Sequence, residues 1–431
     1  MGGMSKRPYE PPTRIAGLVI MVALAAAGCG GEGSPWASTT AAPTTTAVTT
    51  TSVATTTTTS GAPTTVRVAP DGTGDAPDLA AAVGLVAAGG TILLDPGEHH
   101  LAAALLVDKP LTIRGAGSDT TAVVGDRPPE LLRFTGPGTF TMEGITFRYQ
   151  GTEPADGVVT DGGTIAFTDV QVTGAVRTVD PEAIEQAGSG FVITGDATGT
   201  INGCLAADNQ LHGFSFVGTA HVTISASTAD GNGENGFYWA GSAVGTAEGN
   251  TAQGNGLHGF GTQGGATSTL TGNTATNNAE GGFVWLEDAT GTAEGNAAQG
   301  NGLHGFGTED RATSNLAGNT ATGNAQCGFR WAQEAAGTAR RNTSEQNGLS
   351  GFWVADSAAP SLVNNIARGN RHAEGYGSGI VFAETAAGVA RRNQVYDNDW
   401  GIAVGPDAQP RLADNDVHDN GRDIYLDAPV V

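Results

Sequence analysis

Short apolar segments recur at a fixed interval along the second half of the chain. Glycine followed by phenylalanine begins eight successive segments 23 residues apart, at Gly190, Gly213, Gly236, Gly259, Gly282, Gly305, Gly328 and Gly351. The series continues in steps of 28, 22 and 22 residues at Gly379, Gly401 and Asp423, each followed by isoleucine. A constant interval of this length is typical of repeat proteins, in which every repeat is one small structural unit.

Asparagine recurs in the same phase, as pairs five residues apart that run from Asn250 and Asn255 to Asn415 and Asn420. Asn adopts the left-handed backbone conformation more readily than most residues, and its amide can bond to the same amide one repeat away. We therefore expect stacked turns at these residues. Three short strands per repeat, joined by such turns, predict a parallel β-helix in which each strand pairs with its counterpart one repeat later. The Leu frame of a leucine-rich repeat is absent, and a propeller blade needs about 40 residues.

Two positions of the repeat exchange side-chain volume. In the eight consecutive repeats from Gly236 to Gly401, the position eleven residues after the glycine is Ala where the position three after it is Trp or Phe, and Leu where that position is Thr or Val. The pairs are Trp239/Ala247, Thr262/Leu270, Trp285/Ala293, Thr308/Leu316, Trp331/Ala339, Val354/Leu362, Phe382/Ala390 and Val404/Leu412. Such compensation is expected if both positions point into one close-packed interior. Residues 245–290 and 291–336 are identical at 32 of 46 positions, which indicates that two coils at a time were duplicated.

The composition agrees with a narrow core. The chain has 67 Gly and only 6% aromatic residues, which is too little bulk for a wide globular interior. Single soluble cores normally stop growing near ~250–300 residues, whereas a solenoid lengthens without thickening. We therefore expect about 14 coils and no long amphipathic helices over most of the chain.

Segments upstream of the regular repeats resemble the opening of right-handed parallel β-helix proteins of the pectin-lyase-like superfamily. They are residues 69–75, the apolar stretch 79–88, and the segments 89–97 and 110–117. The resemblance covers roughly residues 66–427 and implies an all-β, right-handed, single-stranded β-helix with residues 79–88 as a helix that caps the first coil. It leaves the activity open, because this framework carries lyases, epimerases, hydrolases, tailspikes and proteins without known chemistry.

The N-terminal residues predict export. Lys6, Arg7 and Arg14 precede an apolar run of 13 residues, 15–27, which is too short to span a bilayer and is typical of a signal peptide. Residues 26–28 are small and lead to Cys29, an arrangement that resembles the bacterial lipobox, in which this cysteine is acylated. We therefore divide the chain into a lipoprotein signal peptide (1–28), a Thr-rich disordered tether (29–65) and a β-helix domain (66–427), with the protein anchored at the outer face of the bacterial cell membrane. An ordinary secretory signal beside a cysteine is the alternative.

Charge and cysteine usage exclude some classes of partner and bond. The formal net charge is −23, which disfavours nucleic acid because duplex binding depends on Lys and Arg at the phosphates. Cys204 and Cys327 lie 123 residues apart, more than five repeats, so we do not expect them to form a disulfide.

The position two residues after each glycine should point outward, and it holds the candidate glycan-binding residues Tyr238, Arg330 and Trp353. Extra residues at 371–378 add His372 and Tyr376 to the same region, and Arg340 and Arg391 occupy one phase two coils apart. Rings stack on sugars and guanidinium groups hold acid groups. In relatives, the corresponding strand lines the substrate groove. The alternatives are scattered surface aromatics, and arginines that pair with acids such as Glu334 and Glu345.

Catalytic residues cannot be assigned from the sequence. The Asp-Asp, Gly-His-Gly and Asp-Pro-His signatures of related lyases, hydrolases and epimerases are absent. His212, His258 and His304 recur at intervals of 46, which the duplication explains without catalysis. No cofactor is predicted, although the acidic residues Asp397, Asp399, Asp414, Asp416 and Asp419 allow a Ca²⁺ site as an alternative. The sequence favours an envelope-anchored β-helix that binds polysaccharide; the alternative is a lyase or carbon-5 epimerase of an acidic glycan.

Overall fold

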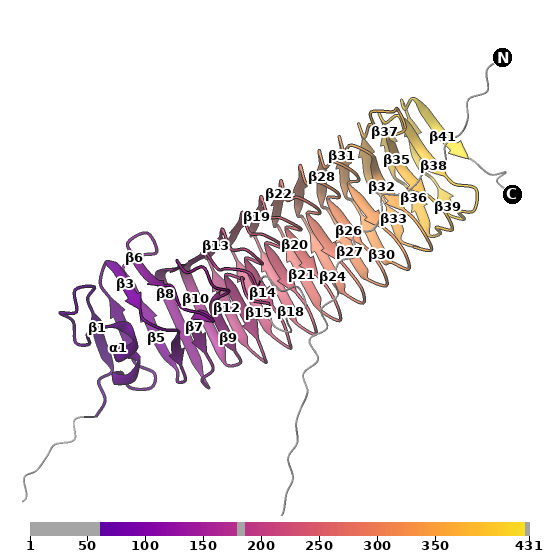
Figure 1. Ribbon diagram of the computed structural model, residues 1–431. Helices are drawn as coiled ribbons and strands as arrows, with labels where there is room; N and C mark the ends of the chain where they lie inside the picture. The colour runs from indigo at the N-terminus through magenta and orange to yellow at the C-terminus, as the bar shows by residue number, and fades with distance from the viewer. Residues whose placement is uncertain (1–60, 179–185, 427–431) are drawn as a thin grey trace, which may run out of the picture. The chain divides into compact units, whose positions relative to one another are not determined.

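The computed structural model describes residues 61–178 and 186–426. The predicted signal peptide, Cys29 and nearly all of the Thr-rich segment lie outside these residues. The described residues form a right-handed parallel β-helix, which confirms the predicted fold class (Figure 1). Their strands belong to two sheets, one of 27 strands (sheet A) and one of 14 strands (sheet B).

Sheet B contains one strand from each coil after the first. In order along the sheet they are β4 (Leu105–Val107), β7 (Glu130–Phe134), β9 (Asp156–Asp161), β11 (Phe191–Thr194), β14 (Phe214–Phe216), β17 (Phe237–Trp239), β20 (Phe260–Thr262), β23 (Phe283–Trp285), β26 (Phe306–Thr308), β29 (Phe329–Trp331), β32 (Ser350–Val354), β35 (Ser378–Phe382), β38 (Trp400–Val404) and β41 (Arg422–Leu426).

Sheet A contains two rows of strands, which meet at a short turn in each coil. The first row is β1 (Thr65–Val68), β2 (Thr91–Leu94), β5 (Leu111–Arg114), β8 (Thr139–Tyr149), β10 (Thr164–Thr173), β12 (Thr198–Asn202), β15 (His221–Ser225), β18 (Val244–Glu248), β21 (Thr267–Thr271), β24 (Thr290–Glu294), β27 (Thr313–Ala317), β30 (Ala336–Arg340), β33 (Ser361–Val363), β36 (Val389–Arg391) and β39 (Arg411–Ala413). The second row is β3 (Gly97–Leu101), β6 (Thr121–Gly125), β13 (Leu205–Ala207), β16 (Thr228–Asp230), β19 (Thr251–Gln253), β22 (Thr274–Thr276), β25 (Ala297–Gln299), β28 (Thr320–Thr322), β31 (Thr343–Glu345), β34 (Ile366–Arg368), β37 (Gln394–Tyr396) and β40 (Asp416–His418), while β8 and β10 run through both rows.

The register follows the repeat interval. Val244 of β18 pairs with Thr267 of β21, and Phe237 of β17 pairs with Phe260 of β20, each 23 residues later. The strand pairings in this region are all parallel, so each strand within a row is hydrogen bonded to its counterpart in the coils before and after it. Residues of equal phase therefore form straight rows along the β-helix.

The interior follows the predicted exchange of volume. The paired positions are buried from Trp239 to Val404, except that Leu412 in the last coil is 36% exposed because no further coil covers it. The Phe row from Phe191 to Phe352 is stacked, with ring centroids 4.7–5.0 Å apart. A third position takes part that the sequence pattern did not reveal. A Cβ atom on Gly291 would lie 1.9 Å from Trp285 Nε1, so the coil that holds Trp has glycine here.

Two ladders of Asn side chains stabilise the turns. Asn273 Nδ2 donates to Asn296 Oδ1 at 3.0 Å, and Asn278 Nδ2 donates to Asn301 Oδ1 at 3.0 Å, a pattern that repeats from coil to coil. The expectation that these Asn residues adopt the left-handed conformation is wrong. The residue before each of them does so, as at Gly272 (φ 62°) and Asn277 (φ 54°), which leaves the Asn free to point into the stack.

A helix caps the first coil, as the resemblance implied. The helix α1 (Leu79–Leu85) begins after Asp78, whose side chain accepts the amide N–H of Ala81 at 2.7 Å, and it buries Leu79, Ala82 and Val83. It is three residues shorter than the apolar stretch. Cys204 and Cys327 are both buried and unpaired, which confirms the prediction that they form no disulfide. Within residues 61–178 and 186–426, no helix has the length and hydrophobicity to cross a membrane.

Candidate functional site on the outer face of sheet B

The outer face of sheet B is built from two rows of side chains that interlock. One row is the outward position in the middle of each strand, and the other is the residue just before the glycine. The His212 ring lies on the Tyr238 ring of the next coil, with centroids 4.4 Å apart, and Trp400 lies on Tyr425 in the same way at 4.7 Å. A residue of the second row therefore covers the outward residue of the following coil.

The three histidines of the second row are neutral and accept hydrogen bonds from the backbone. Their Nδ1 atoms accept backbone N–H groups one coil later, from Asn235 for His212, Gly281 for His258 and Cys327 for His304, at 3.1–3.4 Å. Burial lowers the pKa of His212 and His304 to about 3 and that of His258 to about 4. Because Nδ1 is occupied, the proton of each neutral ring resides on Nε2.

Carboxylates and arginines flank this row. Glu309 forms an ion pair with the outward residue Arg330, and Glu280 Oε2 lies 3.7 Å from His258 Nε2. Burial, together with the negative charge of Glu309, raises the pKa of Glu280. Further toward the N-terminus, Glu234 pairs with Arg177 at 2.7 Å. Carboxylate, imidazole and guanidinium groups thus converge beside the outward positions, a grouping for which the sequence had given no motif.

Glycines leave the middle of this face without large side chains. Gly261 and Gly307 are outward positions, and Gly281 belongs to the second row. A Cβ atom on Gly281 would lie 2.5 Å from Val284 Cγ2 and 3.3 Å from His258 Nδ1, so a larger residue there would crowd both side chains. Between Tyr238 and Arg330 the outward positions are thus Gly261, Val284 and Gly307.

The C-terminal coils of the face are aromatic. Arg330 and Trp353 are register partners on adjacent strands, as predicted, and the Trp353 side chain is half-buried. In the loop before β35, the rings of His372 and Tyr376 are stacked at 4.0 Å. Arg422 lies over the Tyr425 ring at 4.7 Å and extends this group to the last coil.

One carboxylate fixes the loop at 371–377. Asp399 Oδ2 accepts the backbone N–H groups of His372 at 2.9 Å and Gly377 at 3.0 Å. Asp399 Oδ1 lies 3.7 Å from Arg371 Nη1. Asp399 lies in the turn just before β38, and its side chain thereby holds both ends of the loop beside sheet B.

The structure separates the predicted glycan-binding residues into two surfaces. Arg330, Trp353, His372 and Tyr376 lie on the sheet B side, and Tyr238 lies on the same face four coils earlier. Arg340 and Arg391 instead end β30 and β36 of sheet A. They belong to a different surface, because the chain turns between Arg330 and Arg340. The suggested pairing with Glu345 is not formed, since that carboxylate binds Arg368 at 2.8 Å.

Sequence reasoning missed Trp400 and Arg422 as members of this face. Trp400 directly precedes Gly401, which is the phase of the three histidines, so the same rule would have found it. The acidic residues between 397 and 419 do not gather into a metal site: the described part of the chain has no group of three or more His, Cys, Asp or Glu side chains that could hold a metal ion.

The repeat and the register agree with the match to a known family. Residues 212–367 and 315–428 match the family described as right handed beta helix region. Together the two matches span residues 212–428, just over half of the 431 residues. The chain belongs to this family. Membership establishes the solenoid but not the ligand.

Several solved structures are similar to this chain. A mutant of the periplasmic alginate epimerase AlgG is 14% identical, with 76% of each chain covered and a TM-score of 0.53. The catalytic unit of a GH87 alpha-1,3-glucanase from Streptomyces thermodiastaticus is 15% identical over 73% of this chain and 64% of that one, with a TM-score of 0.48. The A-module of the Azotobacter vinelandii mannuronan C-5 epimerase AlgE6 is 16% identical over 79% and 92%, with a TM-score of 0.43. At these identities the likeness concerns the fold alone. No curated protein matches the chain.

Proposed function

We propose that this protein binds a polysaccharide along the outer face of sheet B, over its last five coils. The observation that carries the proposal is the pairing of Trp353 with Arg330 in one register, which continues through the His372–Tyr376 loop to the stacked Trp400 and Tyr425. Strands of one sheet are about 4.8 Å apart, so one sugar ring on Trp353 is within reach of the Arg330 guanidinium. Aromatic faces and arginine are the side chains that suit sugar rings with polar or acidic substituents.

Tyr238 is not part of the proposed binding surface. Its ring lies on His212, and its hydroxyl donates to Gln263 Oε1 at 3.1 Å. The ring and the hydroxyl group of Tyr238 therefore both have partners within the protein, although Tyr238 is an outward aromatic residue.

Binding is favoured over catalysis by the state of the histidines. A general base needs a free nitrogen lone pair, and in His212, His258 and His304 this lone pair accepts a backbone N–H group. Their low pKa values also make them weak bases. The alternative function, a lyase or carbon-5 epimerase of an acidic glycan, draws support from the grouping of Glu280, His258 and Arg330, but it requires a base that these rings do not offer.

The leader suggests where binding takes place. We propose that the chain is exported and held at the outer face of the bacterial cell membrane through acylated Cys29, with the Thr-rich segment as a tether. This location would place the β-helix among envelope or extracellular glycans.

The binding proposal is tested with the full chain and a panel of neutral and acidic polysaccharides. The Arg330→Ala, Trp353→Ala double variant should bind its glycan about thirtyfold more weakly at an unchanged melting temperature, since stacking and one charged contact are each worth about 1 kcal/mol. The matched control is Arg177→Ala, Tyr238→Ala, which also removes an ion-paired arginine and an outward aromatic from this face. Unchanged affinity in the first variant, or an equal loss in the control, would contradict the proposed position. Unsaturated sugar products or a change in uronate composition would instead show catalysis.

A further inference from the structure

A second surface is suggested by the ion pairing of the arginines. Residues 61–178 and 186–426 contain 16 arginines, of which ten form an ion pair with a carboxylate. The six that do not are all located after residue 339, namely Arg340, Arg341, Arg391, Arg392, Arg411 and Arg422. A chain with 43 acidic and 20 basic residues has carboxylates in excess, so a group of arginines without an ion pair is unexpected.

Five of these arginines are exposed and lie together on sheet A. Arg340 pairs in register with Val363, and Val363 pairs with Arg391, so the two arginines are two strand spacings, or about 10 Å, apart. Arg341 and Arg392 follow them in the turns, and Arg411 lies on β39, the strand beside β36. We refer to Arg340, Arg341, Arg391, Arg392 and Arg411 as the arginine corner.

The turn positions of the arginine corner are conformationally unfavourable for arginine. Arg341 and Arg392 have φ of 56° and 55°, and the same position in four preceding coils is a glycine with φ of 62–63°. A non-glycine residue in the left-handed region costs roughly 1 kcal/mol or more, a cost that tends to persist where it serves a function. The fold therefore does not explain why arginine stands there.

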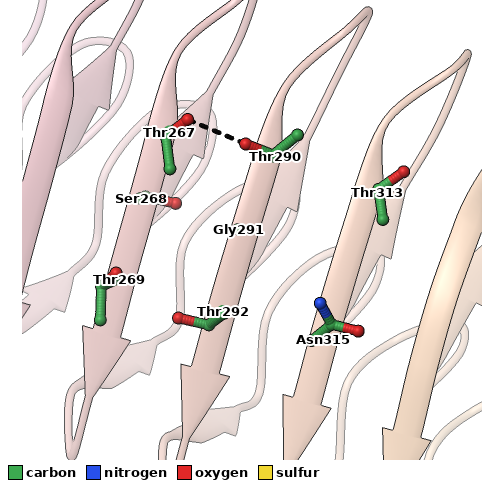
Figure 2. A pocket seen from close by; sticks show the side chains of 8 residues that line it. All are labelled: Thr267, Ser268, Thr269, Thr290, Gly291, Thr292, Thr313 and Asn315. Atoms are coloured by element: carbon green, nitrogen blue, oxygen red, sulfur yellow. Dashed lines mark hydrogen bonds between the residues drawn. The ribbon is translucent and has the colours of Figure 1, made fainter.

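The arginine corner continues a row of hydroxyl groups on the same sheet. Figure 2 shows a hollow on strands β21, β24 and β27, lined by side chains that include Thr267, Thr269, Thr290, Thr292 and Asn315. Thr267 and Thr290 share a hydrogen bond of 2.8 Å between their hydroxyls, and Gly291 forms part of the lining between two buried serines. The same register row continues from Asn315 through Thr338, Ser361 and Val389, and it ends at Arg411.

We infer that this side of sheet A binds an anionic polysaccharide. Sugar hydroxyls would meet the Thr and Asn side chains of the hollow, and the acid groups would meet Arg340, Arg391 and Arg411. Glu294 lies in the same register row as Arg340, two coils before it, and would repel the acid groups of the polysaccharide. These acid groups should therefore bind at the coils after Ala317. Asp414 follows β39 beside Arg392 and limits the anion-binding region at the other end. This inference does not rest on the sheet B surface, which is a different face of each coil.

The test measures binding of the full chain to a uronate polymer, alginate or polygalacturonate, and to a neutral glucan of equal length. The Arg340→Ala, Arg391→Ala variant should bind the uronate about tenfold more weakly, because two charge-assisted contacts are lost. Arg311→Ala, Arg368→Ala is the matched control: it removes the same charge, but from exposed arginines that already pair with Asp288 and Glu345. Its affinity should change by less than about twofold. Raising the ionic strength from about 0.05 M to about 0.5 M should weaken wild-type binding and remove most of the difference between the variants.

Several outcomes would overturn the inference. These are equal affinity of wild type and the Arg340→Ala, Arg391→Ala variant, an equal loss in the control, equal binding of the neutral glucan, or binding to anionic phospholipid vesicles without binding to either uronate. Failure of the sheet B proposal is distinguishable, since it would show as unaltered affinity of the Arg330→Ala, Trp353→Ala variant alone.

Discussion

Trp285 occupies a coil in which its neighbours are reduced to Ala293 and Gly291. Its indole N–H donates to Ser268 Oγ of the preceding coil at 2.9 Å, so the side chain is both packed and hydrogen bonded. In the coil before it, Thr262 and Leu270 share the same space, and the Thr262 hydroxyl donates to Ser268 as well. The two arrangements alternate from coil to coil and fill the interior. A side chain of one arrangement does not fit the other, because the space that it needs is already occupied.

Replacing Trp285 by Ala should therefore open a cavity that Ala293 and Gly291 cannot fill. We expect a loss of ~3–5 kcal/mol in the free energy of unfolding, measured by denaturant titration or by hydrogen exchange in the coils around β23. Thr292→Ala, an exposed change in the same coil, should cost less than about 0.5 kcal/mol. Equal small effects would mean that the Trp row does not face the interior. Local protection can fall without loss of the whole fold, because solenoid stability is roughly a sum over neighbouring repeats.

At the scale of single residues, the sequence predicted the walls of the interior but not the turns. Residues of equal phase share a wall, so repeated Phe and alternating Trp and Leu identify it directly. The left-handed position could not be assigned in this way. Gly272 and Asn277 are both compatible with positive φ, and so is the Asn that follows each, so the register of the turn decides which residue takes it.

Strands and turns also decide which residues meet. Arg330 and Arg340 are ten residues apart in the sequence, and both were candidate glycan-binding residues. The turn between β29 and β30 places them on different sheets, since a coil with two sheets has more than one outer face. A repeat interval fixes the rows along the axis but not the direction in which each row points.

The loop before β35 is the element whose position depends most on one side chain. Asp399→Ala removes the acceptor of two backbone N–H groups, so we expect the loop to lose about 2 kcal/mol of local stability. Hydrogen exchange at residues 371–377 should become faster, and glycan affinity on sheet B should fall. The exposed Asp407→Ala serves as the control and should leave both unchanged. Unaltered exchange in Asp399→Ala would show that the loop is held by its own rings instead.

For the whole molecule, the anchoring prediction concerns residues that the structure does not describe. Metabolic labelling with a fatty-acid analogue should mark the wild-type chain and leave Cys29→Ala unlabelled, because the thiol of this cysteine is the expected acylation site. The variant should also leave the membrane fraction, since a tether alone has little affinity for a bilayer. Equal labelling of both proteins would exclude the lipoprotein interpretation.

The two Asn ladders have a direction along the molecule. In both, the side-chain N–H of one coil donates to the oxygen of the next coil toward the C-terminus, as from Asn250 to Asn273 and from Asn398 to Asn420. The amide dipoles are therefore aligned and leave partial positive charge at the C-terminal end, as aligned peptide dipoles do at one end of a helix. There Asp423 Oδ1 accepts both the backbone and the side-chain N–H of Asn420, at 3.2 and 3.1 Å. The Asp423 carboxylate thus neutralises the partial positive charge at the end of this Asn ladder. This electrostatic role of an acidic residue in the last coil requires no metal ion.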